Sequence, residues 1–483
     1  MDWILVIELV VMLFCIWLGS RSGGIALGFW GGVGLLIITF VFREVPTEPP
    51  VDVMLIILAV TCATATMQAA GGIDFMVRIA EAIIKKYPSR ITFVAPLVAY
   101  LFTFAAGTGH ILYPLLPVIH DTALRNGIRP ERPMSVSVVA SLQGITASPV
   151  SAAMAALIVV VEPLGMSLPK IMMIAVPATI VGVLAASAVM LKWGKELEED
   201  PIFQARVAAG EVEDIPGIIK ARRLASRKKI SVEEALTELN LDTAVAVDEQ
   251  VSEQEKRFEE EITAEKNGAI PGSGKITAAI FLLAVITVVV LGAVPEWRPP
   301  GPEGKALNIA IVIQIIMLTA AAIMCMITKV KVRAIAESAI ARTGLIALVG
   351  IFGLAWLGLT VIQANKDTIV NGLENMVTNS PWTFAVALFA CSIVLFSQAS
   401  TTRTLAPLGV SLGLAAPALV GMWPAVNGAF FLPTYGTSVA ALNFDRTGTT
   451  RIGNAVLNHS FMVPGVVAII AAVITGLLIS TVV

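Results

Sequence analysis

Two short polar stretches within otherwise apolar sequence carry residue types that can bind a small anion. The first is Thr108-Gly109-His110, and the second runs from Ser397 to Arg403. The arginine side chain presents a planar fork of donors that can hold a carboxylate in a bidentate pair. Serine and threonine hydroxyls add neutral donors that bind a ligand and release it again. The candidate residues of the second stretch are Ser397, Gln398, Ser400, Thr401, Thr402 and Arg403.

The charged and titratable members of these stretches each allow a functional and a structural interpretation. Arg403 lies inside a long apolar segment, where a charge is a functional candidate by default. Its alternative role is to pair with backbone carbonyls or to extend to the membrane surface. His110 can donate to a second carboxylate, can titrate near physiological pH, or can be a hydrogen-bonded structural residue. His120 and His459 are expected to be structural.

Two further polar stretches interrupt apolar segments with proline. Ser148 and Pro149 interrupt one segment, and Pro433 and Thr434 interrupt another. Proline removes a backbone donor, and in hydrocarbon such a break occurs only where protein or a water-filled cavity satisfies the freed groups. Helix N-termini at a break present unpaired N–H groups and a partial positive charge. The four polar stretches together predict one central cavity for a small anion.

The elements that must position these residues are membrane helices. Of the 483 residues, 56% are hydrophobic and 14% are charged, and the mean hydropathy is +0.84. A soluble chain of this length would need more charge to cover its surface. Bilayer-spanning lengths of apolar sequence recur along the chain. They are expected at 3–19, 23–42, 52–70, 91–124, 134–161, 168–191, 276–294, 306–328, 342–362, 381–418, 421–443 and 457–483.

Composition also limits the partners and the chemistry. The net charge of −2 gives no basic bias toward nucleic acid, so the lipid bilayer is the expected surrounding. The three histidines are scattered and form no metal-ligand pair, which argues against an enzyme or a bound metal. The four cysteines lie in apolar segments without metal or disulfide spacing. We expect no cofactor.

The chain is expected to form two membrane domains, 1–191 and 276–483, joined by a charged linker at 192–275. Segment 91–124 is basic at both ends, which favours a re-entrant hairpin that enters and leaves on the cytoplasmic side. Segment 381–418 is its expected counterpart. The fold class predicted is all-α integral membrane, an inverted repeat of two halves, each with three transmembrane helices, a re-entrant helical hairpin and two further helices, one of them broken.

A weak internal repeat supports this division. Thr108, His110 and Pro114 of the first hairpin align with Thr401, Arg403 and Pro407 of the second. The distribution of Lys and Arg then places both termini on the periplasmic side and the linker in the cytoplasm. The linker is expected to be a solvated helical connector, or to contact lipid headgroups or a partner.

Two lesser patterns concern packing. Residues 72–88 and 364–378 mix apolar and charged positions, as helices at the membrane interface do. Gly24, Gly28 and Gly32 share one helix face and predict close approach of a neighbouring helix. That neighbour belongs either to the same chain or to a second copy in a homo-oligomer.

Several longer motifs resemble the Dcu family of bacterial anaerobic C4-dicarboxylate transporters. The most specific are NFDRTGTTRIG from Asn443 to Gly453 and NHSFMVPG from Asn458 to Gly465. The resemblance covers nearly the whole chain except the linker. Further matching stretches are Arg21–Gly28, Pro50–Met54, Gln68–Gly72, Gly107–His110 and Asn126–Met134.

The resemblance implies exchange of fumarate, malate, succinate or aspartate across the inner membrane by alternating access, with an elevator-type movement. The alternative hypothesis is a Na⁺- or H⁺-coupled dicarboxylate symporter of the same fold. The chain also looks like the broader ion-transporter superfamily, whose hairpin tips carry Ser-Asn-Thr motifs that bind substrate and Na⁺. Here Gly107-Thr108-Gly109-His110 and Ser400-Thr401-Thr402 stand in their place, which weakens the expectation of Na⁺ sites.

Overall fold

The described part of the chain is helical. The computed structural model describes residues 3–22, 25–212, 272–301, 306–365, 380–395, 397–432, 435–453 and 457–483, together with a few isolated positions between them. Within these ranges the backbone forms helices and two isolated β-bridges, with no β-strand. The predicted all-α class is confirmed.

The first half contains nine α-helices and three short 3₁₀ turns. The 3₁₀ turns are η1 (Pro88–Arg90), η2 (Gly109–Leu112) and η3 (Glu162–Leu164). The α-helices are α1 (Trp3–Ser22), α2 (Ala26–Phe40), α3 (Val51–Ala69), α4 (Gly72–Lys86), α5 (Ile91–Ala106), α6 (Leu115–Arg125), α7 (Glu131–Ala147), α8 (Ala152–Val161) and α9 (Leu168–Met190).

The second half follows the described start of the linker, which holds η4 (Leu197–Glu199) and α10 (Pro201–Ala208). A π-helix, η7 (Ile351–Ala355), and a 3₁₀ helix, η8 (Trp423–Phe430), lie within its longer helical runs. Its α-helices are α14 (Gly272–Ala293), α15 (Ile309–Thr328), α16 (Val332–Ala336), α17 (Ala339–Gly350), α18 (Trp356–Ala364), α20 (Thr383–Leu395), α21 (Gln398–Ser411), α22 (Ala416–Met422), α23 (Gly436–Phe444) and α24 (Met462–Ser480).

Eight helical runs within the described ranges are long and apolar enough to cross a membrane. They are Val51–Ala69, Pro88–Ala106, Glu131–Leu164, Leu168–Met190, Gly272–Ala293, Ile309–Thr328, Ala339–Ala364 and Met462–Ser480. Shorter apolar helices cover Trp3–Gly19, Gly28–Phe40 and Thr383–Ile393. The protein is therefore a multi-pass membrane protein, as the sequence predicts.

The helices stop where the sequence places its polar interruptions. In segment 91–124, α5 ends at Gly107, whose φ of +70° is a conformation that other residues adopt at a cost. In segment 381–418, α20 and α21 are separated at Ser397, which has extended backbone angles. Segment 134–161, which we call the first broken span, parts into α7 and α8 at 148–151. Segment 421–443, which we call the second broken span, is interrupted before α23.

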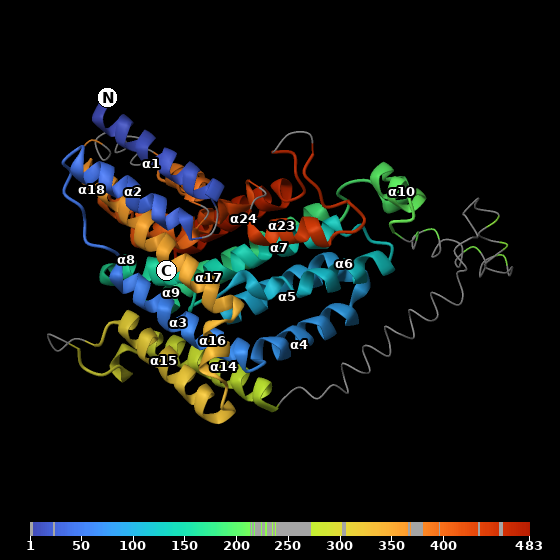
Figure 1. The fold of residues 1–483 in the computed structure, drawn as a ribbon, viewed down its shortest axis with the longest axis horizontal. Helices are drawn as coiled ribbons and strands as arrows, with labels where there is room; N and C mark the ends of the chain where they lie inside the picture. The colour runs from blue at the N-terminus through green and yellow to red at the C-terminus, as the bar shows by residue number, and fades with distance from the viewer. Residues whose placement is uncertain are drawn as a thin grey trace.

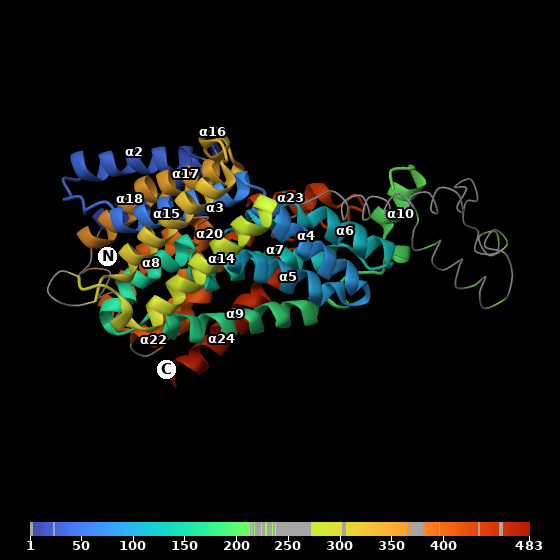
Figure 2. The ribbon, with the colours of Figure 1, turned by 90° about the horizontal axis from the view of Figure 1, so that it is seen from below.

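Corresponding helices make corresponding contacts within the two halves, and other helices pack across them. Helix α5 packs against α7, as α20 packs against η8. Helices α9 and α24 lie side by side across the halves, on the side of the bundle opposite α2, α17 and α18 (Figure 2). Helix α8 of the first half contacts α21 of the second, and α23 contacts α6. Each post-break helix therefore packs against the second arm of the other half's hairpin segment.

The chain termini and helix α10 lie at different ends of the bundle. Both chain termini lie toward one end, and α10 lies at the opposite end beside α6 (Figure 1). Helix α10 packs onto the membrane helices, since Phe203 is fully buried in a cluster with Leu124 of α6. The described start of the linker is thus docked, and most of 209–271 lies outside the described residues.

The two predicted amphipathic segments have different outcomes. Segment 72–88 forms α4, which buries Ile73, Met76, Val77, Ala80 and Ile84 along one face. Its location at the membrane interface stays a prediction. Segment 364–378 lies almost entirely outside the described residues.

The small residues of α2 pack within the same chain. A Cβ at Gly28 would lie 2.2 Å from the carbonyl oxygen of Val349, and one at Gly31 would lie 2.4 Å from the carbonyl carbon of Gly353. Close approach of α2 to α17 and η7 therefore requires glycine at these positions. Gly32 meets nothing within 4 Å, and Gly24 lies outside the described residues.

Candidate functional site

The turn between α5 and α6, which we call tip one (residues 107–112), is shaped by glycine and a hydroxyl cap. Gly107 ends α5 in the left-handed region, and Thr108 is extended. The Thr108 hydroxyl oxygen then accepts a hydrogen bond of 3.4 Å from the backbone N–H of His110. A Cβ at Gly109 would lie 3.1 Å from the Ser141 hydroxyl oxygen, so tip one sits closely on α7.

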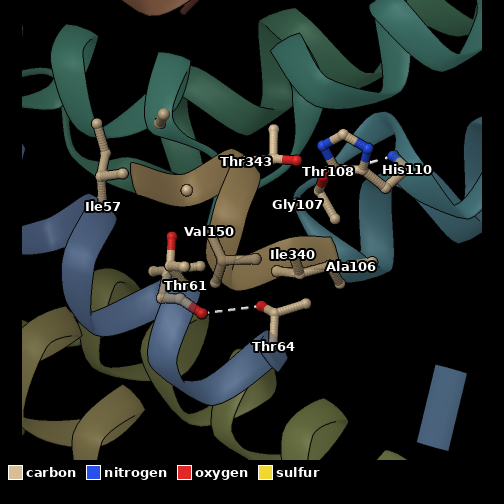
Figure 3. A pocket seen from close by; sticks show the side chains of 13 residues that line it. Ile57, Thr61, Thr64, Ala106, Gly107, Thr108, His110, Val150, Ile340 and Thr343 are labelled. Atoms are coloured by element: carbon tan, nitrogen blue, oxygen red, sulfur yellow. Dashed lines mark hydrogen bonds between the residues drawn. The ribbon is translucent and has the colours of Figure 1, made fainter. Parts of the chain in front are cut away.

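Tip one borders a cavity of about 110 Å³. Its walls come from tip one, from α3, from the break in the first broken span and the start of α8, and from the start of α17, so both halves contribute (Figure 3). Drug-sized ligands occupy pockets of roughly 300–1,000 Å³, and this cavity suits a smaller molecule. The polar side chains that line it are Thr61, Thr64, Thr108, His110 and Thr343.

The break in the first broken span lies beside tip one. The Ser148 hydroxyl accepts a hydrogen bond from the backbone N–H of Val150, and Ser148 and Pro149 are both buried. Ser151 caps α8 by accepting from the N–H of Met154 at 3.0 Å. Val150 and Ala152 line the cavity. The structure therefore brings Thr108, Gly109 and His110 next to the break that carries Ser148 and Pro149.

The described turn before α21, which we call tip two (residues 397–400), is held by its own hydrogen bonds. The Ser397 hydroxyl caps α21 by accepting from the N–H of Ser400 at 3.1 Å. The hydroxyl of Thr401 donates to the carbonyl oxygen of Ser397. The hydroxyl of Thr402 donates to the backbone carbonyl oxygen of Gln398. Thr402 also accepts from the Trp423 indole N–H at 2.8 Å. These residues and Arg403 are not among those that line the tip-one cavity.

Arg403 is half-buried on α21, five residues past the start of the helix. Its buried Nε atom has no hydrogen-bond partner within the described ranges. The carboxylate of Asp52, at the start of α3, is close enough to act on it electrostatically. The two side chains form no ion pair within 4.0 Å in the described structure, so the guanidinium keeps donors for a ligand. Of the other second-half candidates, Pro433 and Thr434 lie outside the described residues.

Four buried side chains form a polar network at the centre of the bundle, which we call the amide network. Gln398 of tip two donates to the side-chain oxygen of Asn427 and to the carbonyl oxygen of Leu142, the latter at 2.9 Å. Thr146 donates to the same Asn427 oxygen at 2.8 Å. Asn427 donates to the side-chain oxygen of Gln143 at 3.1 Å. Tip two is thereby fastened to the broken spans of both halves.

Sequence reasoning passed over two members of this network, Gln143 and Asn427. A usable signal was present, because each precedes a glycine at the equivalent place in its broken span. A Cβ at Gly144 would lie 2.7 Å from the carbonyl oxygen of Tyr100 in α5. One at Gly428 would lie 2.4 Å from the Ser392 hydroxyl in α20. In each amide–glycine pair, the amide side chain therefore contacts the opposite half. The glycine packs against the hairpin segment of its own half.

A second buried polar cluster lies at the α10 end of the bundle, and sequence reasoning also missed it. Arg129 pairs with Glu131 and Asp200, each at 2.5 Å. Glu131 accepts a hydrogen bond of 2.6 Å from the Ser460 hydroxyl of the second half. Burial alone would raise the pKa of Asp200, but its hydrogen bond from Arg129 and those from backbone N–H groups lower that pKa below its ordinary value.

The same cluster gives the predicted structural histidines their partners. His120 donates or accepts at 2.8 Å with Asp121 and lies 3.5 Å from Asp445. Burial alone would raise the pKa of Asp445, but His120 and the hydrogen bonds from Thr447 and Thr450 hold it at about 2. His459 bonds the carbonyl oxygen of Phe431 at 2.9 Å. Both histidines therefore tie segments together away from the cavity.

Comparison with known proteins gives concordant matches over the full length. Residues 4–483 match the family model for an anaerobic C4-dicarboxylate membrane transporter. The anaerobic C4-dicarboxylate transporter DcuB of Escherichia coli O6:H1 is 36% identical over 475 residues, which cover 97% of each chain. The C4-dicarboxylate transporter DcuA of Wolinella succinogenes is 34% identical over 99% of each chain. DcuA of Escherichia coli K12 is 36% identical over 98% of each chain.

Proposed function

Because the chain belongs to the family of anaerobic C4-dicarboxylate membrane transporters, we propose that it exchanges C4-dicarboxylates across the bacterial inner membrane. The substrates proposed are fumarate, malate, succinate and aspartate. The family and the compared relatives are transporters and not enzymes. The carrying observation is the tip-one cavity, which is small, lined by hydroxyls and an imidazole, and walled by both halves.

The proposed mechanism is alternating access by an elevator-type movement. The two halves form an inverted repeat, in which segments 91–124 and 381–418 are re-entrant hairpins. Support comes from the matching contacts of α5 with α7 and of α20 with η8. The termini are proposed to face the periplasm and residues 192–275 the cytoplasm. In support, α10 in the described start of this segment lies at the end of the bundle opposite the termini (Figure 1).

Within this mechanism tip one and tip two close on a substrate from opposite sides. Neutral hydroxyls and His110 hold one carboxylate at tip one, and Arg403 supplies the fixed positive charge for the other. An empty carrier is expected to cross poorly, because an unpaired Arg403 is costly to carry through a closed state. Exchange then follows from the need for a bound substrate in each direction.

Counterflow in proteoliposomes tests this proposal. Vesicles are loaded with succinate or left empty, and uptake of labelled fumarate is measured with equal Na⁺ and equal pH on both sides. We expect uptake in loaded vesicles and little in empty ones. Uptake into empty vesicles that requires a Na⁺ or pH gradient would instead establish the alternative, a cation-coupled dicarboxylate symporter of the same fold.

A further inference from the structure

The ring of His110 is stacked on the ring of Tyr113. Residues 109–112 form a 3₁₀ turn, and the N–H of Tyr113 donates to the carbonyl oxygen of His110 at 3.2 Å. In this turn type the side chains at i and i+3 eclipse each other. The two ring centroids accordingly lie 5.6 Å apart with an interplanar angle of 17°. The orientation of the imidazole that borders the cavity thus depends on Tyr113.

Tyr113 in turn rests on the second half of the chain. A Cβ added to Gly436 would lie 2.4 Å from the Tyr113 hydroxyl oxygen, and the next nearest atom is Cζ of the same ring at 3.7 Å. The φ of Gly436 is not among the positive ones, so its backbone does not demand glycine. A Cβ there would instead have to displace the Tyr113 hydroxyl. Gly436 is the first residue of α23, directly after the break in the second broken span.

We propose that Tyr113 and Gly436 are positioning residues that let the second half of the chain set the orientation of His110. The chain of contact runs from the start of α23 through the Tyr113 hydroxyl and ring to the imidazole at the cavity. A displacement of α23 relative to tip one would turn the imidazole and alter its hold on a substrate carboxylate. This inference rests on the proposed function, because it assumes that His110 serves a dicarboxylate site.

A suppressor experiment tests the contact directly. Gly436→Ala should raise the half-saturating fumarate concentration in counterflow by about tenfold or more, because a displacement of 1 Å in a positioning group can cost about 100-fold. Tyr113→Phe keeps the stacked ring but loses the hydroxyl that faces Gly436, so its half-saturating concentration should lie between those of wild type and Gly436→Ala. The double variant should recover to the level of Tyr113→Phe, since removal of the hydroxyl leaves Cζ at 3.7 Å, an ordinary contact distance. Gly350→Ala, which meets nothing within 4 Å, is the matched control.

The His110→Gln background separates positioning from folding. If Gly436 acts through His110, adding Gly436→Ala to His110→Gln should raise the half-saturating concentration no further. A purely structural defect would add to it. The inference is overturned if Tyr113→Phe fails to restore the Gly436→Ala variant, or if the effects of Gly436→Ala and His110→Gln are additive.

Failure of the proposed function has a different signature. If His110→Gln binds and exchanges fumarate as the wild type does, tip one is not the dicarboxylate site. If His110→Gln is impaired but the suppressor fails, the site stands and only the positioning route is wrong. Size-exclusion elution of each detergent-purified variant as a single symmetric peak is required before its transport is compared.

Discussion

The side-chain amide of Asn427 donates a hydrogen bond of 3.1 Å to the side-chain oxygen of Gln143, joining the two halves of the chain at their corresponding amide–glycine pairs. The oxygen of the same Asn427 side chain accepts from Gln398 of tip two and from Thr146 of the first broken span. All four side chains are buried. Asn427 is therefore the hub through which tip two is fastened to both broken spans.

Replacing this hub should destabilise the protein. Asn427→Ala leaves the side-chain oxygen of Gln143 without its donor. It also removes the acceptor of one hydrogen bond from Gln398 and of one from Thr146. An unsatisfied buried polar group costs about 1–3 kcal/mol, so we expect a loss of at least that size. Thermal unfolding of the detergent-purified protein measures it. Ser411→Ala, which removes an exposed side-chain hydrogen bond, is the control, and equal stability of the two variants would contradict the role of Asn427 as hub.

The helices were predictable because their signal is local. An apolar run of bilayer length has few alternatives, since hydrocarbon forces backbone groups to pair within the segment. The interruptions at 107–109, 148–151 and Ser397 were equally readable, because glycine, proline and hydroxyl residues stand out against apolar neighbours. The docking of α10 was not readable. It depends on the ion pair between Asp200 and Arg129. The sequence around either residue does not indicate a partner so distant along the chain.

The candidate site was predictable only in part, for a related reason. Tip one and the first break do lie together, and their residues were named from type and spacing alone. The contribution of Thr61, Thr64 and Thr343 to the cavity depends on how α3 and α17 pack, which hydrophobic periodicity does not specify. The role of Gly436 was not predictable from the sequence either, because it depends on the position of the Tyr113 hydroxyl in the folded chain.

Arg403 offers a direct test of substrate binding. Arg403→Ala should abolish fumarate binding, measured by calorimetry in detergent, while unfolding temperature changes little. Arg403→Lys should bind more weakly than wild type, because a point charge cannot reproduce the planar fork. Asp52→Asn is the matched variant, since Asp52 is the carboxylate that acts on Arg403. If Arg403 serves only to interact with Asp52, the Asp52 variant should lose binding to the same extent.

Stability should depend on pH through Asp445. Its pKa of about 2 lies below the ordinary value of about 3.9, so its contribution is present above about pH 4 and is lost as pH falls toward 2. Asp445→Asn should therefore cost about 2–3 kcal/mol at neutral pH. The difference from wild type should close as the pH falls from 4 to 2. Chemical unfolding across this range measures it, with exposed Asp74→Asn as control. A difference that is constant down to pH 2 would contradict the assignment.

The contact between α2 and η7 should tolerate no side chain at Gly353. A Cβ there would lie 1.8 Å from the carbonyl oxygen of Gly28, which is backbone and cannot rotate away. Gly353→Ala should therefore separate the two helices and cost at least the roughly 1–3 kcal/mol of an overpacked core. Because η7 also contacts α21, exchange should fall with stability. Gly32→Ala, on the same helix as Gly28 with open space around it, should match wild type in unfolding temperature and in counterflow. If the two alanine variants behave alike, the close approach of α2 to η7 is not required for folding or transport.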